Sequence, residues 1–260
     1  MFIDQLCSGI AETGGRVCVG LDPHMDRIPS QYGPDVAGVE RFLQHVISET
    51  APHAAVYKPN AAFFEAMGPE GLRLLRRVID SVHRLDRSAI LDAKRGDIAS
   101  TAGAYARALL GEMAADAVTV VAYMGEEAVV PFLEAGGFAF VVAVPSNASA
   151  RAIIEHGDPP LYLRIVEMAC TLFERFPKQV GLVVGATQPD KVCRVRAGCP
   201  DLPWLVPGLG AQGGDAAAFF SALEGEQLFV ANASRSILFA DDPAAAACSM
   251  KHMIEELRHA

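Results

Sequence analysis

The chain has 260 residues, of which 51% are hydrophobic and 20% are charged, and its formal net charge is −9. This size and composition suit one globular domain over residues 1–260 with a sizeable core. The negative charge argues against a nucleic-acid-binding protein, which usually carries a basic face, although a local basic cluster could still hold a small anion. No apolar stretch reaches membrane-spanning length, and the N-terminus lacks the pattern of a signal peptide.

Eight short apolar runs recur along the chain and predict strands. They are continuous rather than alternating, which is typical of parallel strands covered on both faces. The runs are VCVGL (17–21), AAVYK (54–58), AILDA (89–93), AVTVV (117–121), FAFVVAV (138–144), VGLVVG (180–185), PWLVPG (203–208) and QLFVAN (227–232).

Amphipathic segments between these runs predict helices, as at 71–85 and 161–176. In the C-terminal segment, Asp242 and Pro243 have the pattern of an N-cap and a first-turn proline. Eight strand–helix units in this length predict a (β/α)8 TIM barrel, with an open doubly wound sheet as the alternative. We expect a long loop at 145–160.

The densest group of charges falls in AILDAKRGDIAST, at the end of the third predicted strand. Barrel enzymes gather their chemistry at the carboxyl ends of the strands. Asp92 and Lys94 should share one face because side chains alternate along a strand. Lys58 ends the neighbouring strand, and Asp97 follows Gly96, where the chain can turn. The group is either a structural ion-pair network or a catalytic site.

Charge balance favours the catalytic interpretation. Two lysines and two aspartates cancel, which lowers the cost of burying each ion. A substrate carboxylate beside Asp92 would upset this balance, and its departure as CO2 would restore it. Lys94 could then stabilise the carbanion that is left and donate a proton to it.

Two further charges lie near this group. Asp22 ends the first strand in VGLDPH, where it either caps the following turn or holds a substrate hydroxyl. Arg95 falls between Lys94 and Asp97, and we expect it to form a structural salt bridge.

A glycine-rich segment follows the seventh predicted strand. Gly208, Gly210 and Gly213 formally match the G-x-G-x-x-G dinucleotide fingerprint. The motif lies late in the chain, however, and the next strand ends in Asn232 and leads to Arg235 instead of the expected acidic residue. These departures favour a site for a single phosphate.

The predicted phosphate site combines the loops after the seventh and eighth strands, a common arrangement in barrels. Backbone N–H groups near Gly213 and at Ser234 can converge on the anion, and the Arg235 guanidinium adds charge and paired donors. Gln212 can reach either the phosphate or another part of the ligand. The alternative is a pair of tight glycine turns beside a surface arginine.

The six cysteines are scattered, without short paired spacing or a histidine at zinc-ligand distance. We therefore expect reduced thiols, as is usual in the cytosol. They are Cys7, Cys18, Cys170, Cys193, Cys199 and Cys248.

Taken together, these motifs resemble the orotidine 5′-phosphate decarboxylase family, in the bacterial form with the DAKRGDI spelling. LDAKRGDI is similar to the D-x-K-x-x-D signature of that family, which related sugar-phosphate decarboxylases share. The further segments VGLDPH, YKPN, SN after the fifth strand, PGLGAQGG and NASRSI occur in family order across the whole chain.

The resemblance implies a TIM-barrel enzyme that decarboxylates orotidine 5′-monophosphate (OMP) to UMP, the last step of de novo pyrimidine synthesis. It implies a cytoplasmic homodimer with no metal or organic cofactor. Lys94 would stabilise and protonate the C6 carbanion, Asp92 would lie near the leaving carboxylate, and Lys58 would bridge the charges and contact ribose. Asp97 would enter the partner subunit's site.

The resemblance also assigns binding roles. Asp22 would bind a ribose hydroxyl, Ser146 with Asn147 would meet the pyrimidine, and Gln212 and Arg235 would hold the phosphate. The segment VPSNAS departs from the family pattern, since Pro145 and Ala148 stand where Thr and Pro are frequent. Pro145 removes one backbone N–H and changes the local backbone beside Ser146.

Two rival functions remain open at the level of sequence. A sugar-phosphate decarboxylase that uses Mg²⁺ would need an acidic ligand near the end of the second strand, where Lys58 stands. A catalytically silent barrel protein would bind UMP without turnover.

Overall fold

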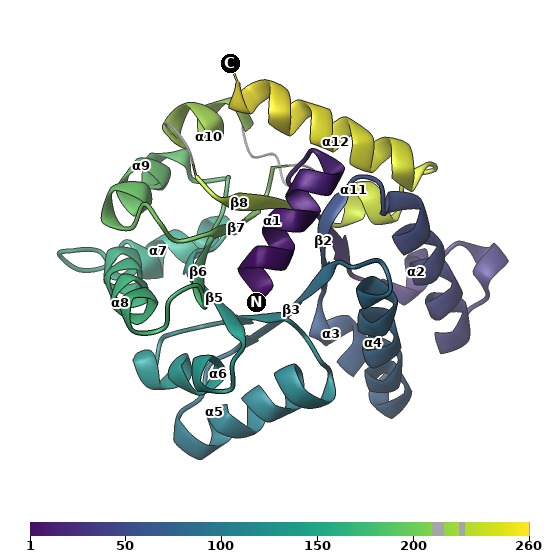
Figure 1. Cartoon of the computed structure of the whole chain (residues 1–260), viewed down its shortest axis with the longest axis horizontal. Helices are drawn as coiled ribbons and strands as arrows, with labels where there is room; N and C mark the ends of the chain where they lie inside the picture. Colours follow the sequence, from purple (N-terminus) through teal and green to yellow (C-terminus); the bar gives the residue numbers. More distant parts are fainter. Residues whose placement is uncertain (210–215, 224–226, 260) are drawn as a thin grey trace.

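Eight parallel strands close into a barrel in chain order in the computed structural model, which describes residues 1–209, 216–223 and 227–259 (Figure 1). The first strand pairs with both the second and the eighth, so the sheet has no open edge. This closure confirms the predicted (β/α)8 barrel and excludes the open doubly wound sheet. The strands are β1 (Val17–Leu21), β2 (Ala54–Pro59), β3 (Ser88–Arg95), β4 (Ala117–Val120), β5 (Phe138–Val144), β6 (Val180–Val184), β7 (Trp204–Pro207) and β8 (Phe229–Ala233).

Helices follow every strand and form a ring around the barrel (Figure 1). The apolar faces of these helices pack against the strand residues that point out of the barrel. Together they form the larger of two hydrophobic clusters. The helices are α1 (Phe2–Thr13), α2 (Val36–Thr50), α3 (Ala61–Glu65), α4 (Gly68–His83), α5 (Ala99–Ala106), α6 (Val130–Glu134), α7 (Arg151–Ile154), α8 (Leu161–Arg175), α9 (Pro189–Gly198), α10 (Ala216–Leu223), α11 (Arg235–Leu238) and α12 (Pro243–Arg258).

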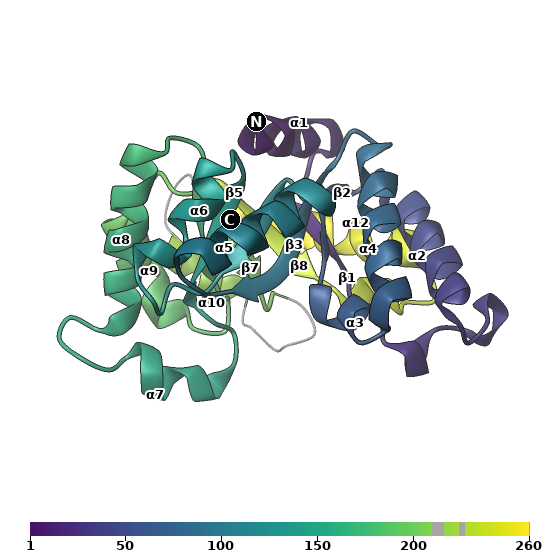
Figure 2. The same cartoon turned by 90° about the horizontal axis from the view of Figure 1, so that it is seen from below.

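Helix α1 closes the amino-terminal end of the barrel (Figure 2). Phe2 packs against Phe138 and Phe140, with ring centroids 4.7 Å and 5.8 Å apart. Together with inward-facing strand residues, α1 forms the second hydrophobic cluster, which fills the lower part of the barrel. Because this end is packed with apolar side chains, the polar chemistry is confined to the opposite end.

Strand alternation places the polar residues of that opposite end. The inner cluster takes Val56 from β2, Ile90 from β3 and Ala117 from β4. Side chains two positions further along a strand face the same way. This rule brings three polar side chains to the top of the barrel interior, namely Lys58, Asp92 and Thr119.

The predicted helix boundaries hold to within a few residues. Asp242 is the N-cap of α12, where its carboxylate accepts a hydrogen bond from the backbone N–H of Ala245 at 2.9 Å, and Pro243 is in the first turn. The segment 145–160, expected to be a loop, contains the short helix α7. Within the described ranges, no helix is long and apolar enough to cross a bilayer.

The expectation of reduced thiols is wrong for two cysteines. Cys170 of α8 and Cys199, directly after α9, form a disulfide with their Cα atoms 6.0 Å apart. They are 29 residues apart in sequence. Spacing along the chain does not reveal this pair, because it depends on the packing of α8 beside α9.

Candidate active site

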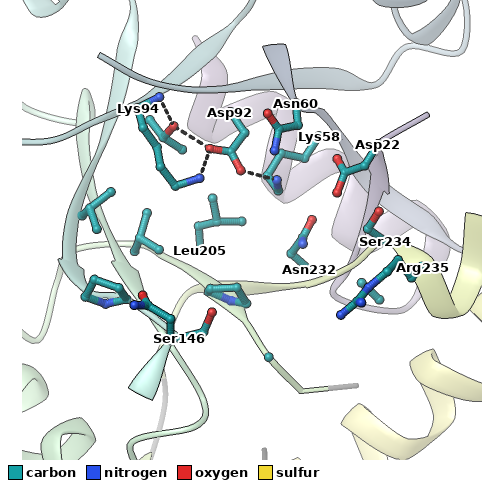
Figure 3. A pocket seen from close by; sticks show the side chains of 18 of the residues that line it. Asp22, Lys58, Asn60, Asp92, Lys94, Ser146, Leu205, Asn232, Ser234 and Arg235 are labelled. Atoms are coloured by element: carbon teal, nitrogen blue, oxygen red, sulfur yellow. Dashed lines mark hydrogen bonds and ion pairs between the residues drawn. The ribbon is translucent and has the colours of Figure 1, made fainter. Parts of the chain in front are cut away.

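A pocket opens at the carboxyl ends of the strands, over the top of the barrel interior (Figure 3). Its floor is apolar, with Val142, Val183 and Leu205, and its walls are mainly polar. Most of the side chains that the sequence selected meet here. The pocket is lined by Asp22, Lys58, Asn60, Asp92, Lys94, Thr119, Val142, Pro145, Ser146, Asn147, Val183, Leu205, Pro207, Gly208, Asn232, Ala233, Ser234, Arg235 and Ser236.

The carboxylate of Asp92 lies between two ammonium groups (Figure 3). Lys58 Nζ donates a hydrogen bond to Asp92 Oδ2 at 2.6 Å, and Lys94 Nζ donates to Oδ1 at 2.5 Å. Lys58 is 4% exposed and Asp92 is 8% exposed, whereas the side chain of Lys94 is half-exposed and reaches into the open pocket. A charged ligand that binds at Lys94 would therefore change the electrostatic environment of the Asp92 carboxylate.

Burial and charge act in opposite directions on these groups. Burial alone raises the pKa of Asp92, but the nearby charges of Lys58 and Lys94 and their hydrogen bonds outweigh it and hold the pKa well below its usual range. Burial lowers the pKa of Lys58, and the charges of Asp92 and Asp22 outweigh it and raise the pKa. Asp92 and Lys58 are therefore both ionised at neutral pH.

Lys94 reaches the pocket by a different route from the one expected. Leu91 pairs with Val118 and Arg95 with Val120, so three residues of β3 stand opposite one residue of β4. Lys94 also has a left-handed backbone, with φ of 44°. The side chain is thus directed by a bulge in the strand, not by simple alternation.

Gly96 does not make the turn that the sequence suggested. Lys94 and Ala99 have positive φ values of 44° and 48°, whereas Gly96 does not have a positive φ. Gly96 is required because a Cβ there would lie 2.6 Å from the carbonyl oxygen of Val121. The residue permits close approach of two loops.

Sequence reasoning missed Thr119, which contacts both Asp92 and Lys94. Its side chain donates to Asp92 Oδ1 at 2.9 Å and accepts from the backbone N–H of Lys94 at 2.9 Å. The available signal was a lone polar residue in the apolar run AVTVV. Asn60 and Asn232 also line the pocket, as expected for polar residues at the carboxyl ends of barrel strands.

Two buried side-chain atoms of the pocket have no hydrogen-bond partner in the described part of the chain. They are Asp22 Oδ1 and Ser234 Oγ, and both are buried. Within the described residues no hydrogen bond joins the Asp22 side chain to the turn after β1, which favours the ligand-binding interpretation. Buried polar atoms without a partner are costly, so a bound ligand with hydroxyl groups would satisfy them.

Arg235 lies at the rim of the pocket beside Ser234 (Figure 3), and Ser236 also lines the pocket. Its side chain is exposed, and it forms no ion pair with any residue of the described ranges. A guanidinium in this position can bind an anion with paired donors. The two other residues predicted for the phosphate, Gln212 and Gly213, lie outside the described residues.

Ser146 and Asn147 line the side of the pocket formed by the loop after β5. The loop after β6 supports them. Thr187 Oγ1 donates to the carbonyl oxygen of Ser146 at 2.8 Å, and Gln188 Nε2 donates to that of Pro145 at 2.7 Å. These bonds fix the backbone around Pro145 although this residue has no N–H of its own.

Asp97 does not line the pocket of its own chain. Its Oδ1 accepts a hydrogen bond from the backbone N–H of Ile98 at 2.8 Å. Arg95 forms the expected salt bridge, with Glu65, and stacks over the ring of Tyr105 at 5.2 Å. No set of three acidic, histidine or cysteine side chains within the described ranges could hold a metal ion.

The fold and the pocket define a class, a (β/α)8 barrel with a buried lysine–aspartate network at one end of the site and, at the other, a guanidinium that forms no ion pair with the described residues. Residues 15–250 match the family model described as orotidine 5′-phosphate decarboxylase / HUMPS family. The chain belongs to this family, which confirms the resemblance seen in the sequence.

Curated relatives and solved structures agree with this assignment. The chain is 38% identical over 265 residues to the orotidine 5′-phosphate decarboxylase of Roseiflexus castenholzii, covering all of this chain and 96% of the relative. It is 39% identical to that of Herpetosiphon aurantiacus, covering 92% and 90%. The structure of Leishmania donovani OMP decarboxylase superposes with a TM-score of 0.87 at 36% identity, covering 100% and 99%.

Proposed function

We propose that this protein converts OMP to UMP and CO2, as the last step of de novo pyrimidine nucleotide synthesis. The observation that carries the proposal is the Lys58–Asp92–Lys94 network, in which two cations hold one carboxylate at the edge of an open pocket. The family and the names of its curated members supply the substrate.

The proposed reaction is a direct decarboxylation. The bond between C6 and the carboxyl carbon breaks, CO2 leaves, and the electron pair remains on C6. The Lys94 ammonium stabilises this carbanion and transfers one proton to it, which gives UMP and a neutral amine that regains its proton from water. Asp92 lies beside the substrate carboxylate, so their repulsion is relieved when CO2 departs.

The remaining pocket residues would bind the rest of the substrate. Asp22 and Lys58 contact the ribose, while Ser146 and Asn147 contact the pyrimidine. Arg235 and Ser234, together with Gln212 and Gly213, hold the phosphate. Contacts to this distant group supply binding energy that aligns C6 with Lys94.

The position of Asp97 supports a shared site in a homodimer. Its side chain does not line the pocket of its own chain, and the Lys94 side chain is half-exposed at the mouth of that pocket. Asp97 of a second copy would place a further carboxylate near this exposed ammonium. The segment that carries Asp97 also exposes Ile98, and the adjacent loop exposes Tyr123 and Met124, an apolar surface suited to a second copy.

The two loops are held together at this surface. The backbone N–H of Val121 donates to the carbonyl oxygen of Arg95 at 2.7 Å, so both loops would meet a partner as one unit. We further propose that residues 1–260 act as one catalytic domain in the cytoplasm, without a metal or organic cofactor.

The test is to incubate the purified protein with OMP in D2O. We expect UMP and CO2 in equal amounts, and deuterium at C6 of the product, because the Lys94 ammonium exchanges its protons with solvent. Binding of UMP without any consumption of OMP would contradict the proposal and favour a silent binding protein.

A further inference from the structure

Thr119 occupies the one position of β4 that faces the catalytic group. It is 1% exposed and lies two residues beyond Ala117, which belongs to the inner cluster. Its neighbours Val118 and Val120 point to the outer cluster. A threonine here is unusual among apolar neighbours, since a buried hydroxyl needs partners to offset its desolvation.

The bulge in β3 creates a need for such a hydroxyl. Between the paired positions of the two strands, Asp92, Ala93 and Lys94 stand opposite Thr119 alone. A bulge leaves its extra residues without ladder partners. The Lys94 N–H is one such group, and it donates to Thr119 Oγ1 at 2.9 Å.

The same hydroxyl also binds the carboxylate that holds the Lys94 ammonium. Thr119 Oγ1 lies 2.9 Å from Asp92 Oδ1, the oxygen that also accepts from Lys94 Nζ. A backbone N–H can only donate and an ionised carboxylate can only accept, so the hydroxyl proton must point to Asp92. One side chain thereby fixes both ends of Lys94, its backbone directly and its ammonium through Asp92.

The backbone of Lys94 needs this support. A lysine with φ of 44° is in the left-handed region, which is unfavourable for a residue with a Cβ and persists when its surroundings hold it. If the bond to Thr119 is lost, the backbone can relax and move Nζ away from its position.

We propose that Thr119 is a positioning residue for the decarboxylation, which holds the left-handed backbone of Lys94 and the carboxylate of Asp92 so that Nζ faces the reacting carbon. This inference rests on the proposed role of Lys94 as proton donor. In this role Thr119 acts through its hydrogen bonds to Asp92 and Lys94 and not through contact with the substrate.

Replacement by valine tests the proposal, because Thr119→Val keeps the size of the side chain and removes only the hydroxyl. We expect kcat for OMP to fall about 10²-fold, the loss that a small displacement of a reacting group produces. The KM for OMP and the dissociation constant of UMP should change less than about threefold, since phosphate and ribose contacts remain.

Thr119→Ser is the matched control, because it keeps the hydroxyl. Its kcat should lie within a few-fold of the unmodified protein, and its hydroxyl should restore most of what Thr119→Val loses. If Thr119→Val does not fold, Thr119→Cys replaces it, since a thiol is a weak donor and acceptor and should also lower kcat.

Three outcomes would overturn the proposal. The first is an unchanged kcat in Thr119→Val or its cysteine replacement. The second is equal damage in Thr119→Ser. The third is a parallel loss of kcat, UMP binding and thermal stability, which indicates a purely structural role.

Lys94→Ala, measured beside these variants, separates this inference from the function on which it rests. If Lys94→Ala is inactive and Thr119→Val is fully active, only the role of Thr119 fails. If Lys94→Ala is fully active, the proposed mechanism itself fails, and the role of Thr119 with it.

Discussion

Asp92 and Lys58 form a buried ion pair, with 2.6 Å between Oδ2 and Nζ. Such a pair is not in itself strong evidence for stability, because desolvation of both ions opposes their attraction. Its geometry has a clearer meaning here, since the pair holds the carboxylate against the wall of a pocket and leaves Oδ1 for Lys94 and Thr119. The pair therefore orients the charge that the proposed substrate would meet.

This pair predicts a particular dependence of stability on pH. The pKa of Asp92 is lower in the folded protein than in the unfolded chain, so its contribution is present above the unfolded pKa of about 4 and is lost as pH falls below it. We expect the free energy of unfolding to decline more steeply between about pH 5 and pH 3 in the unmodified protein than in Asp92→Asn. Urea denaturation at a series of pH values measures both slopes, and equal slopes would contradict the prediction.

Arg235 should determine substrate affinity through the phosphate. Its guanidinium is exposed at the rim and is free of ion pairs within the described ranges. We expect Arg235→Ala to lower kcat/KM for OMP about 10²-fold, chiefly through KM, because charge-assisted hydrogen bonds are lost. Arg235→Lys should keep part of the affinity, since it retains the charge but not the paired donors. An unchanged KM in Arg235→Ala would place the phosphate elsewhere.

The shared site can be tested by mixing two inactive variants. In a hybrid dimer of Lys94→Ala with Asp97→Ala, one site lacks both residues and the other has both. Random exchange of subunits should restore about a quarter of the activity of the unmodified protein, because half of the dimers are hybrids with one intact site each. Absence of recovery after both mixing and co-expression would rule out an exchange of Asp97 between subunits.

Removal of divalent cations separates the proposal from its magnesium-dependent rival. Lys58 is the second-to-last residue of β2, near the strand end where that rival needs an acidic ligand, and an ammonium there repels a divalent cation. We therefore expect the rate of OMP consumption to be unchanged after dialysis against excess EDTA. Loss of activity that returns on addition of Mg²⁺ would favour the rival.

The sequence predicted the barrel well because its signal is local. Each strand is a continuous apolar run. Alternation alone puts Val56 and Lys58 on one face of β2, and Ile90 and Asp92 on one face of β3. These two rules placed a lysine and an aspartate at the same end of the barrel without any structure.

The features that the sequence did not predict depend on relations between elements. The bulge that directs Lys94 is a mismatch between β3 and β4, so neither strand reveals it alone. Thr119 gains its role only through that register. The disulfide between Cys170 and Cys199 likewise depends on the packing of two helices.

The central claim is that Lys94 performs the decarboxylation of OMP. The most direct measurement follows the loss of OMP absorbance with the unmodified protein and with Lys94→Ala. We expect the unmodified protein to consume OMP and Lys94→Ala to be at least about 10³-fold slower, since both charge stabilisation and the proton donor are removed. UMP should still bind to the variant. Turnover by Lys94→Ala at the unmodified rate would contradict the account.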